Sequence, residues 1–410
     1  MKKIYTYSVI ISVIMIAALT VSFFALRPAA RADNNPAPSP YVVLGWNSLG
    51  MHCLDPSFSE ICILPPFNTL MVQVLRRGAP VSVVTSGITL EYSIEKNTTV
   101  VGKTDFWQYA NQLFGVNLPI GVGLTGNGLK GVMKLNGDHY EATGIPLLPL
   151  DDKMRWNPYQ VAAVVLKDKG GKVIQTSRIV VPVSDELNCA KCHAGDADAS
   201  LAYGINTGTV EGNILAIHDK ISGTTLSSQK PVLCANCHGS NALGKPGNGV
   251  QKSLSEAMHG KHSRIMGDVP GCYDCHPGQN TQCLRTAISG MGSATGDDPS
   301  CPSCHGDLAN VAATIATGRR PWLDEPTCEQ CHGDSHTVKG GLYRDTKGPD
   351  GVYCAGCHNS PHVWWPSKRA IDNVQPNSLQ SAPTAIGANS CQICHTRPIK
   401  GATPHSRYVN

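Results

Sequence analysis

Seven copies of one five-residue pattern, C-x-x-C-H, constrain the fold of this 410-residue chain more than any other feature. Numbered 1 to 7 in chain order, the motifs are "CAKCH" (Cys189–His193), "CANCH" (Cys234–His238), "CYDCH" (Cys272–His276), "CPSCH" (Cys301–His305), "CEQCH" (Cys328–His332), "CAGCH" (Cys354–His358) and "CQICH" (Cys391–His395). Together they contain 14 of the 17 cysteines. C-x-x-C-H is the attachment motif of c-type haem.

The chemistry of haem attachment explains this spacing. Two thiols add to the two vinyl groups of one porphyrin, and the next residue offers its imidazole to the iron. The predicted thioether cysteines are Cys189, Cys192, Cys234, Cys237, Cys272, Cys275, Cys301, Cys304, Cys328, Cys331, Cys354, Cys357, Cys391 and Cys394. The predicted proximal iron ligands are His193, His238, His276, His305, His332, His358 and His395. The sequence therefore predicts seven haem c groups.

Other cysteine chemistries fit the pattern less well. Zinc ribbons use paired C-x-x-C but do not require a histidine after every pair. A thioredoxin-like redox pair would occur once, beside a βαβ pattern. Structural disulfides suit an exported protein but leave the seven histidines unexplained.

Eight further histidines are available as second, distal iron ligands. His336 and His362 each follow a motif histidine by four residues, which is too short a segment to pass around the ring. Each is therefore predicted to bind a neighbouring haem, and for His336 this is haem 4 or haem 6. The distal candidates are His52, His218, His259, His262, His336, His362 and His405, whereas His139, in the hairpin-like "LNGDHYEAT", is the weakest. Methionine is the rival ligand, but Met258, Met266 and Met291 are interpreted as packing residues.

Three cysteines lie outside the motifs: Cys53, Cys62 and Cys283. Cys53 and Cys62 bracket the short loop "CLDPSFSEIC" and are a candidate disulfide in an oxidising compartment. Pairing of Cys283 with either of them remains an alternative.

The first 32 residues have the features of an export signal. A basic start, "MKK", precedes an apolar run from Ile4 to Leu26 and the small-x-small cleavage pattern "ARA" at 30–32. An uncleaved anchor is the alternative, because the apolar run is long. Cleavage would lower the number of lysines and arginines from 34 to 30, which equals the number of aspartates and glutamates and gives a formal net charge of zero. A neutral mature chain lacks the basic footprint of nucleic-acid binding.

The mature chain divides near residue 186. After a linker at 33–40, residues 41–186 contain segments rich in β-branched residues, among them "YVVLGWN", "ITLEYSI", "GVMKL" and a hairpin around "KDKGGK". This pattern predicts an antiparallel β-sandwich, with a short helix at 104–115 capped by Thr104 or Asp105. Residues 187–410 hold seven motifs, near 32 residues for each, and predict a largely irregular, short-helix multihaem cytochrome c domain.

The motifs and several segments resemble the multihaem c-type cytochromes of metal-reducing bacteria. "LGWNSLGMHCLDP", "LPPFNTL", "AMHGKH" and "CYDCHPGQNTQCLR" are similar to a subgroup with an N-terminal β domain. The resemblance implies electron transfer in the periplasm, at the outer membrane or outside the cell. Its expected partners are other cytochromes or quinol-linked donors, with extracellular metal oxides as candidate acceptors.

Two alternatives to an electron carrier remain. One is a reductase of a small oxyanion or nitrogen compound, which would need an iron with an open site. The other is a self-associating subunit of an extracellular haem filament.

Overall fold

The structure is a computed structural model that describes residues 39–266, 271–287, 301–325, 327, 342–387 and 391–397. The predicted signal peptide at 1–32, motif 5, His336 and His405 lie outside these ranges. Residues from Pro40 onward form one compact unit. In the part of the chain that is described, no helix is both long and apolar enough to cross a bilayer.

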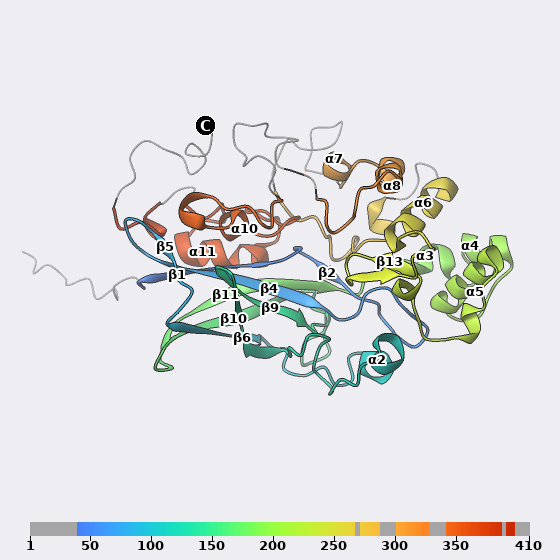
Figure 1. Ribbon diagram of the computed structural model, residues 1–410, viewed down its shortest axis with the longest axis horizontal. Helices are drawn as coiled ribbons and strands as arrows, with labels where there is room; N and C mark the ends of the chain where they lie inside the picture. The colour runs from blue at the N-terminus through green and yellow to red at the C-terminus, as the bar shows by residue number, and fades with distance from the viewer. Residues whose placement is uncertain are drawn as a thin grey trace, which may run out of the picture. The chain divides into compact units, whose positions relative to one another are not determined.

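Two five-stranded sheets occupy the N-terminal region (Figure 1). The first has the order β1-β4-β9-β8, with β5 also paired to β4: β1 Tyr41–Asn47, β4 Asn68–Arg76, β9 His139–Ile145, β8 Lys134–Asn136, β5 Ser82–Val83. The second has the order β2-β11-β10-β6-β7: β2 His52–Cys53, β11 Val173–Ser184, β10 Tyr159–Asp168, β6 Ile88–Ile94, β7 Lys130–Val132. Pairing is antiparallel throughout, except between β2 and β11.

Alternating side chains from both sheets form one hydrophobic core. In β6, Leu90, Tyr92 and Ile94 are buried, and in β4 Leu70 and Val72 are buried. Because successive strand residues point to opposite faces, this alternation turns one face of each sheet inward. These five residues belong to the same buried cluster. Burying a large apolar side chain contributes about 1.5–3 kcal/mol, so the shared core accounts for much of this region's stability.

Most of the predicted strands of this region are confirmed, and one is corrected. The strands Tyr41–Asn47 and Ile88–Ile94 match their predicted segments, and β10 and β11 form the predicted hairpin. The segment "GVMKL" was predicted as one strand, which is wrong. Its first part, β7, belongs to the second sheet and its last part, β8, to the first. The buried Met133 lies between them and donates its backbone N–H to Leu90, so the chain changes sheets where a side chain enters the core.

The predicted short helix is α2, Phe106–Phe114. Thr104 Oγ1 accepts a hydrogen bond from the Phe106 N–H at its start. The Asp105 carboxylate turns away from the helix and accepts bonds from Ser57 Oγ and the Phe58 N–H. Asp105 therefore fixes a loop, and Gly115, at a φ of 71°, ends the helix in the left-handed conformation.

Short elements make up the described part of the motif-bearing region, as predicted from its Gly- and Pro-rich sequence. The α-helices are α3 Ala190–His193, α4 Asp198–Tyr203, α5 Val210–Ser222, α6 Leu254–Met266, α7 Cys301–His305, α8 Leu308–Ala316, α10 Cys354–His358 and α11 Val374–Gln380. The 3₁₀ turns are η1 Leu226–Ser228, η2 Cys234–Asn236, η3 Cys272–Asp274, η5 Pro349–Gly351, η6 Ala370–Asn373 and η7 Cys391–Ile393. The strands are β12 Val232–Leu233, which pairs with β3 Ile61–Cys62, and the pair β13 His238–Ser240 and β14 Lys245–Gly247.

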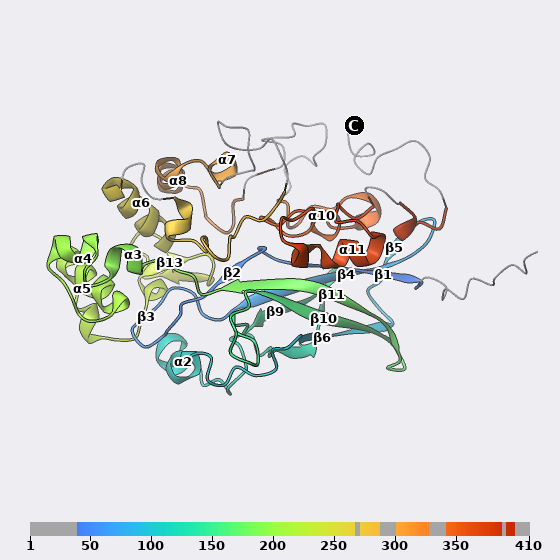
Figure 2. The same ribbon diagram turned by 180° about the vertical axis from the view of Figure 1, so that it is seen from behind.

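Hydrogen bonds cross the predicted boundary at residue 186. Strand β3 pairs with β12 in parallel, and α10 and α11 lie beside β1 and β11 (Figure 2). The Gln375 side chain accepts from the Gly45 N–H and donates to the Gly45 carbonyl, at 2.9 Å in both cases. This buried amide completes the free edge of β1 as a neighbouring strand would.

We predict that Gln375→Ala lowers the free energy of unfolding by on the order of 2 kcal/mol, because it leaves two buried backbone groups without partners. Urea denaturation of the purified protein measures the effect. The matched control is Gln251→Ala, since Gln251 is exposed, and it should leave stability unchanged. Equal stability of the two variants would show that water or a rearranged chain satisfies Gly45.

Candidate functional site

Each described C-x-x-C-H motif folds into a single helical turn. Motifs 1, 4 and 6 are α-helical and motifs 2, 3 and 7 form 3₁₀ turns. In motifs 1, 3 and 7 the histidine N–H donates to the carbonyl of the first cysteine at 2.9 Å. Positions i, i+3 and i+4 of a helical turn lie on one face. The fold therefore presents both thiols and the imidazole of a motif on the same side of the chain.

Four motif histidines face a second imidazole from elsewhere in the chain. The pairs, with the distances between their ring centroids, are His193–His262 at 6.5 Å, His218–His238 at 6.3 Å, His259–His276 at 6.1 Å and His305–His362 at 6.0 Å. Every pair joins one predicted proximal histidine to one predicted distal candidate. His362 follows motif 6 in sequence, but its ring lies opposite the histidine of motif 4.

The spacing within the pairs fits a metal ion between the rings. A histidine nitrogen binds a transition-metal ion at about 2 Å. Adding the distance from each nitrogen to its ring centre places two imidazoles on opposite sides of one ion about 6 Å apart. This is the separation in all four pairs, and it exceeds the spacing of rings in direct stacking contact.

Hydrogen bonds orient several of these rings. Nδ1 of His238 lies 2.8 Å from the Lys252 carbonyl, and Nδ1 of His362 lies 3.2 Å from the Leu49 carbonyl. The Nδ1 atoms of His259 and His262 lie 2.8 and 2.7 Å from carbonyls one turn earlier in α6. A carbonyl only accepts, so each Nδ1 carries the proton and leaves the Nε2 lone pair available. Metal-binding histidines are typically oriented in this way.

Two side chains contact two further rings, and the sequence does not indicate either contact. Nδ1 of His218 lies 3.0 Å from Thr224 Oγ1. Arg319 Nη2 donates to Nδ1 of His305 at 3.2 Å, so this contact, unlike those to the carbonyls, places the proton of neutral His305 on Nε2. Most of the oriented rings contact backbone carbonyls, which every residue type has, so no particular amino acid marks these positions in the sequence. Sequence reasoning therefore could not have found this outer layer.

Helix α6 carries two of the distal candidates on one face. His259 and His262 are three residues apart, yet they face His276 of motif 3 and His193 of motif 1, respectively. Motifs 1 and 3 also contact each other directly. Lys191 Nζ lies 2.5 Å from Asp274 Oδ1, and the Asn188 side chain donates to the Tyr273 carbonyl at 3.0 Å. Motif 3 therefore lies beside motif 1, although motif 2 separates them in sequence.

Motif 3 also lies beside motif 4. The side chains of Cys272 and Cys301, the first cysteines of these motifs, are within hydrogen-bonding reach of each other. Burial lowers the pKa of both His276 and His305 to about 4. Electrostatic repulsion from neighbouring histidines lowers these pKa values further: His259 and then His362 act on His276, and His362 acts on His305. Neutral imidazole, which these shifts favour, is the form that binds metal.

Other predicted ligands have different surroundings. His52 is buried and its Nε2 lies 3.1 Å from Ser48 Oγ, and burial lowers its pKa to about 4. Both ring nitrogens of His139 are buried without a hydrogen bond, and its ring packs edge-on against Tyr353 at 5.2 Å. Among the described residues neither ring faces a motif histidine. In motif 7, His395 Nε2 lies 3.9 Å from Asp350 Oδ2.

The candidate disulfide between Cys53 and Cys62 is absent from the structure, in which both thiols are free. Cys53 lies in β2, which pairs with β11, whereas Cys62 lies in β3, which pairs with β12. Cys62 instead lies near Asp55 and Cys234 of motif 2, whereas Cys53 lies near Cys283. Cys283 also lies close to His362. Against the effect of burial, His362 lowers the pKa of the Cys283 thiol.

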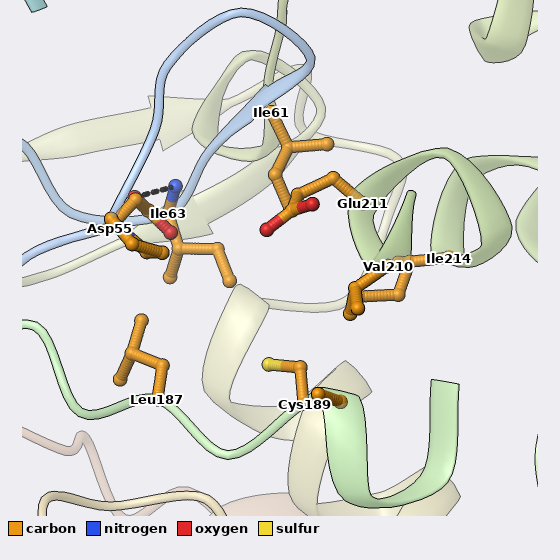
Figure 3. A pocket seen from close by; sticks show the side chains of 10 residues that line it. Asp55, Ile61, Ile63, Leu187, Cys189, Val210, Glu211 and Ile214 are labelled. Atoms are coloured by element: carbon orange, nitrogen blue, oxygen red, sulfur yellow. Dashed lines mark hydrogen bonds between the residues drawn. The ribbon is translucent and has the colours of Figure 1, made fainter. Parts of the chain in front are cut away.

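A cavity of about 150 Å³ borders motif 1 (Figure 3). Its walls are mostly aliphatic, with the Cys189 thiol on one side and the carboxylates of Asp55 and Glu211 on others. Burial raises the pKa of Asp55 to about 7, although the N–H groups of Ile63 and Leu64 bind its carboxylate at 2.7 Å. An apolar space beside the first thiol of a motif is compatible with an attached apolar ring.

Comparison with known proteins gives no family assignment. No protein-family model matches the chain, and no curated protein matches it. Among solved structures it is similar to MtrC from Shewanella baltica OS185, with 13% sequence identity and a TM-score of 0.15 over 68% of this chain. The match covers 45% of MtrC, so the chain spans less than half the length of that protein. A TM-score this low does not establish a shared fold.

Proposed function

We propose that this chain is an exported multihaem c-type cytochrome that carries electrons. The observation that supports the proposal is the set of four histidine pairs, each with ring centroids 6.0–6.5 Å apart and each joining a C-x-x-C-H histidine to a distal candidate. Bound haem would supply one-electron chemistry at an iron whose potential depends on its axial ligands and burial. The two cysteines of each motif would attach the haem, and the paired histidines would supply the imidazoles that bind its iron.

Within this proposal, the order of haems in space differs from their order in sequence. Helix α6 and the contacts of Lys191 and Asn188 join motif 3 to motif 1, and Cys272 joins it to motif 4. Haem 3 would therefore lie between haems 1 and 4. Other cytochromes or quinol-linked donors are the proposed electron donors, and further cytochromes or extracellular metal oxides the proposed acceptors.

The reductase alternative depends on an iron with an open site. Motifs 1 to 4 each have a second imidazole at the right spacing, so these four are unsuited to substrate binding. Among the described motifs, motif 7 differs because its histidine lies near the carboxylate of Asp350. The reductase alternative is best tested there, by measuring whether nitrite or hydroxylamine shifts the absorption spectrum of its haem.

The proposal predicts that the purified mature protein carries seven covalently bound haems, because every motif supplies two thiols and a ligand. Intact-protein mass spectrometry counts them after export in a cytochrome c maturation strain. The matched control is Cys234→Ala with Cys237→Ala, which should carry six. Five or fewer haems in the parent protein would refute the assignment of all seven motifs.

Helix α6 is predicted to provide ligands to two different haems. In a variant without motif 3 (Cys272→Ala with Cys275→Ala), His259→Ala should open no further iron site, because its iron is already absent. His262→Ala in the same background should open one, seen as one more carbon monoxide bound per reduced protein. In a variant without motif 1 (Cys189→Ala with Cys192→Ala), the two results should exchange. Unchanged results between the backgrounds would mean that the pairs are assigned wrongly.

His336 is predicted to bind haem 6. The sequence offers it haem 4 or haem 6, and His362 faces His305 of motif 4. His336→Ala should therefore open one iron site in the parent protein and none in a Cys354→Ala, Cys357→Ala variant. The control background lacks motif 4 (Cys301→Ala, Cys304→Ala), and there His336→Ala should still open one. The reverse pattern would assign His336 to haem 4.

A further inference from the structure

Arg285 is the largest charged side chain that the structure buries completely. Its Nε donates to Asp372 Oδ2 at 2.7 Å, and Nη2 donates to Asp372 Oδ1 at 3.2 Å and to the Gly50 carbonyl at 2.9 Å. Nη1 donates to the carbonyls of Gln282 and Cys283 at 3.3 and 3.2 Å. A guanidinium has five N–H donors, so every one of them has a partner.

These partners come from three parts of the chain. Gly50 lies between β1 and β2, Gln282 and Cys283 follow motif 3, and Asp372 lies in η6 after motif 6. Ser367 Oγ lies 2.9 Å from Asp372 Oδ2 and 3.1 Å from the Arg285 carbonyl, and its single proton is available to either of these acceptors. The side chain of Arg285 is therefore the junction at which the β region meets two segments of the motif-bearing region.

His362 is held by the same junction. Its carbonyl accepts from the backbone N–H groups of Arg285 and Thr286 at 2.7 and 3.2 Å. Its Nδ1 contacts the Leu49 carbonyl, one residue before the carbonyl of Gly50 that Arg285 binds. Gly50 itself lies so close to the Pro361 carbonyl that a Cβ there would clash. The backbone of His362 is thus fixed by Arg285 itself. Its ring is fixed by Leu49, the neighbour of Gly50, which the Arg285 side chain binds.

The conformation of His362 makes such support necessary. Its φ is 67°, in the left-handed region that non-glycine residues rarely adopt. Residues in such conformations persist only where their surroundings determine them. Without the junction, the segment could relax to ordinary backbone angles, which would swing the imidazole away from His305.

We propose that Arg285, paired with Asp372, is a positioning residue that holds His362 as the sixth ligand of haem 4. The inference rests on the proposed function, because it assigns an iron between His305 and His362. Arg285 touches neither ring in this role: it acts through Gly50, Leu49 and its own backbone. A lysine cannot replace it, since an ammonium has three donors and no planar fork to bind a carboxylate and three carbonyls together.

The test compares Arg285→Lys with His362→Ala in the full-length holoprotein. We expect Arg285→Lys to keep the haem mass of the parent protein and to convert one low-spin haem to a high-spin form, detected by electron paramagnetic resonance. The reduced variant should bind one more carbon monoxide than the parent, as His362→Ala does. The double variant should bind no more than either single variant, because both changes open the same iron. The control is Arg178→Lys, since Arg178 forms an exposed two-bond ion pair with Glu95, and it should leave the spin state unchanged.

Each outcome decides the proposal. If Arg285→Lys lowers the melting temperature but keeps every haem low-spin, Arg285 only stabilises the fold and the inference is overturned. The same follows if its open site adds to that of His362→Ala. If Arg285→Lys does not accumulate, Asp372→Asn decides, because it keeps the size of the side chain but removes the charge: full retention of low-spin haem overturns the inference. If mass analysis of the parent shows no haem at motif 4, the proposed function of that site fails and the inference with it.

Discussion

Four pairs of imidazoles connect the described parts of the motif-bearing region: in each, a histidine fixed by a C-x-x-C-H turn faces a second histidine with ring centroids 6.0–6.5 Å apart. The helical turn sets the first ring within five residues. The second comes from α5, from α6 or from the loop after α10, and in all four pairs it is distant in sequence from the motif histidine that it faces. Each pair is therefore a long-range contact, and the path of the chain between the motifs is the path that brings these rings together.

The β region provides the rigid part of this arrangement. Its two sheets share a core of tightly buried side chains, and such a core resists small displacements. Loops at its edge extend to the motif-bearing region: Leu49 orients the ring of His362, Gly50 receives Arg285, and β3 pairs with β12 just before motif 2. A ligand segment attached to this frame is held more firmly than one attached only to other loops. This explains why hydrogen bonds cross the boundary predicted at residue 186.

The local parts of the structure could be predicted from the sequence, and the long-range parts could not. Segments rich in β-branched residues predicted β1, β6 and the β10–β11 hairpin, because the pattern that favours a strand involves only residues close together in the sequence. The motif turns are local for the same reason. By contrast, nothing in "MHGKH" indicates that His259 and His262 face different motifs. The split of "GVMKL" between two sheets depends on the core around Met133. Arg285 gave no signal, since its partners are mostly carbonyls.

A buried ion pair is a costly way to join three segments, because desolvation of two charges can exceed their attraction. In other proteins an apolar pair of similar volume is often as stable as a buried ion pair, so stability alone does not account for Arg285 and Asp372. The ion pair also sets the orientation of the joined segments relative to one another. The planar guanidinium fixes the carboxylate and three carbonyls at set angles, and an apolar contact would allow the segments to slide against one another. Sliding matters little for a core, but in the proposed haem 4 site the rings of His362 and His305 would have to keep a fixed separation, 6.0 Å between centroids in this structure. The cost of burying Arg285 is therefore best understood as the cost of that precision, since the residue it supports is held in an unfavourable backbone conformation.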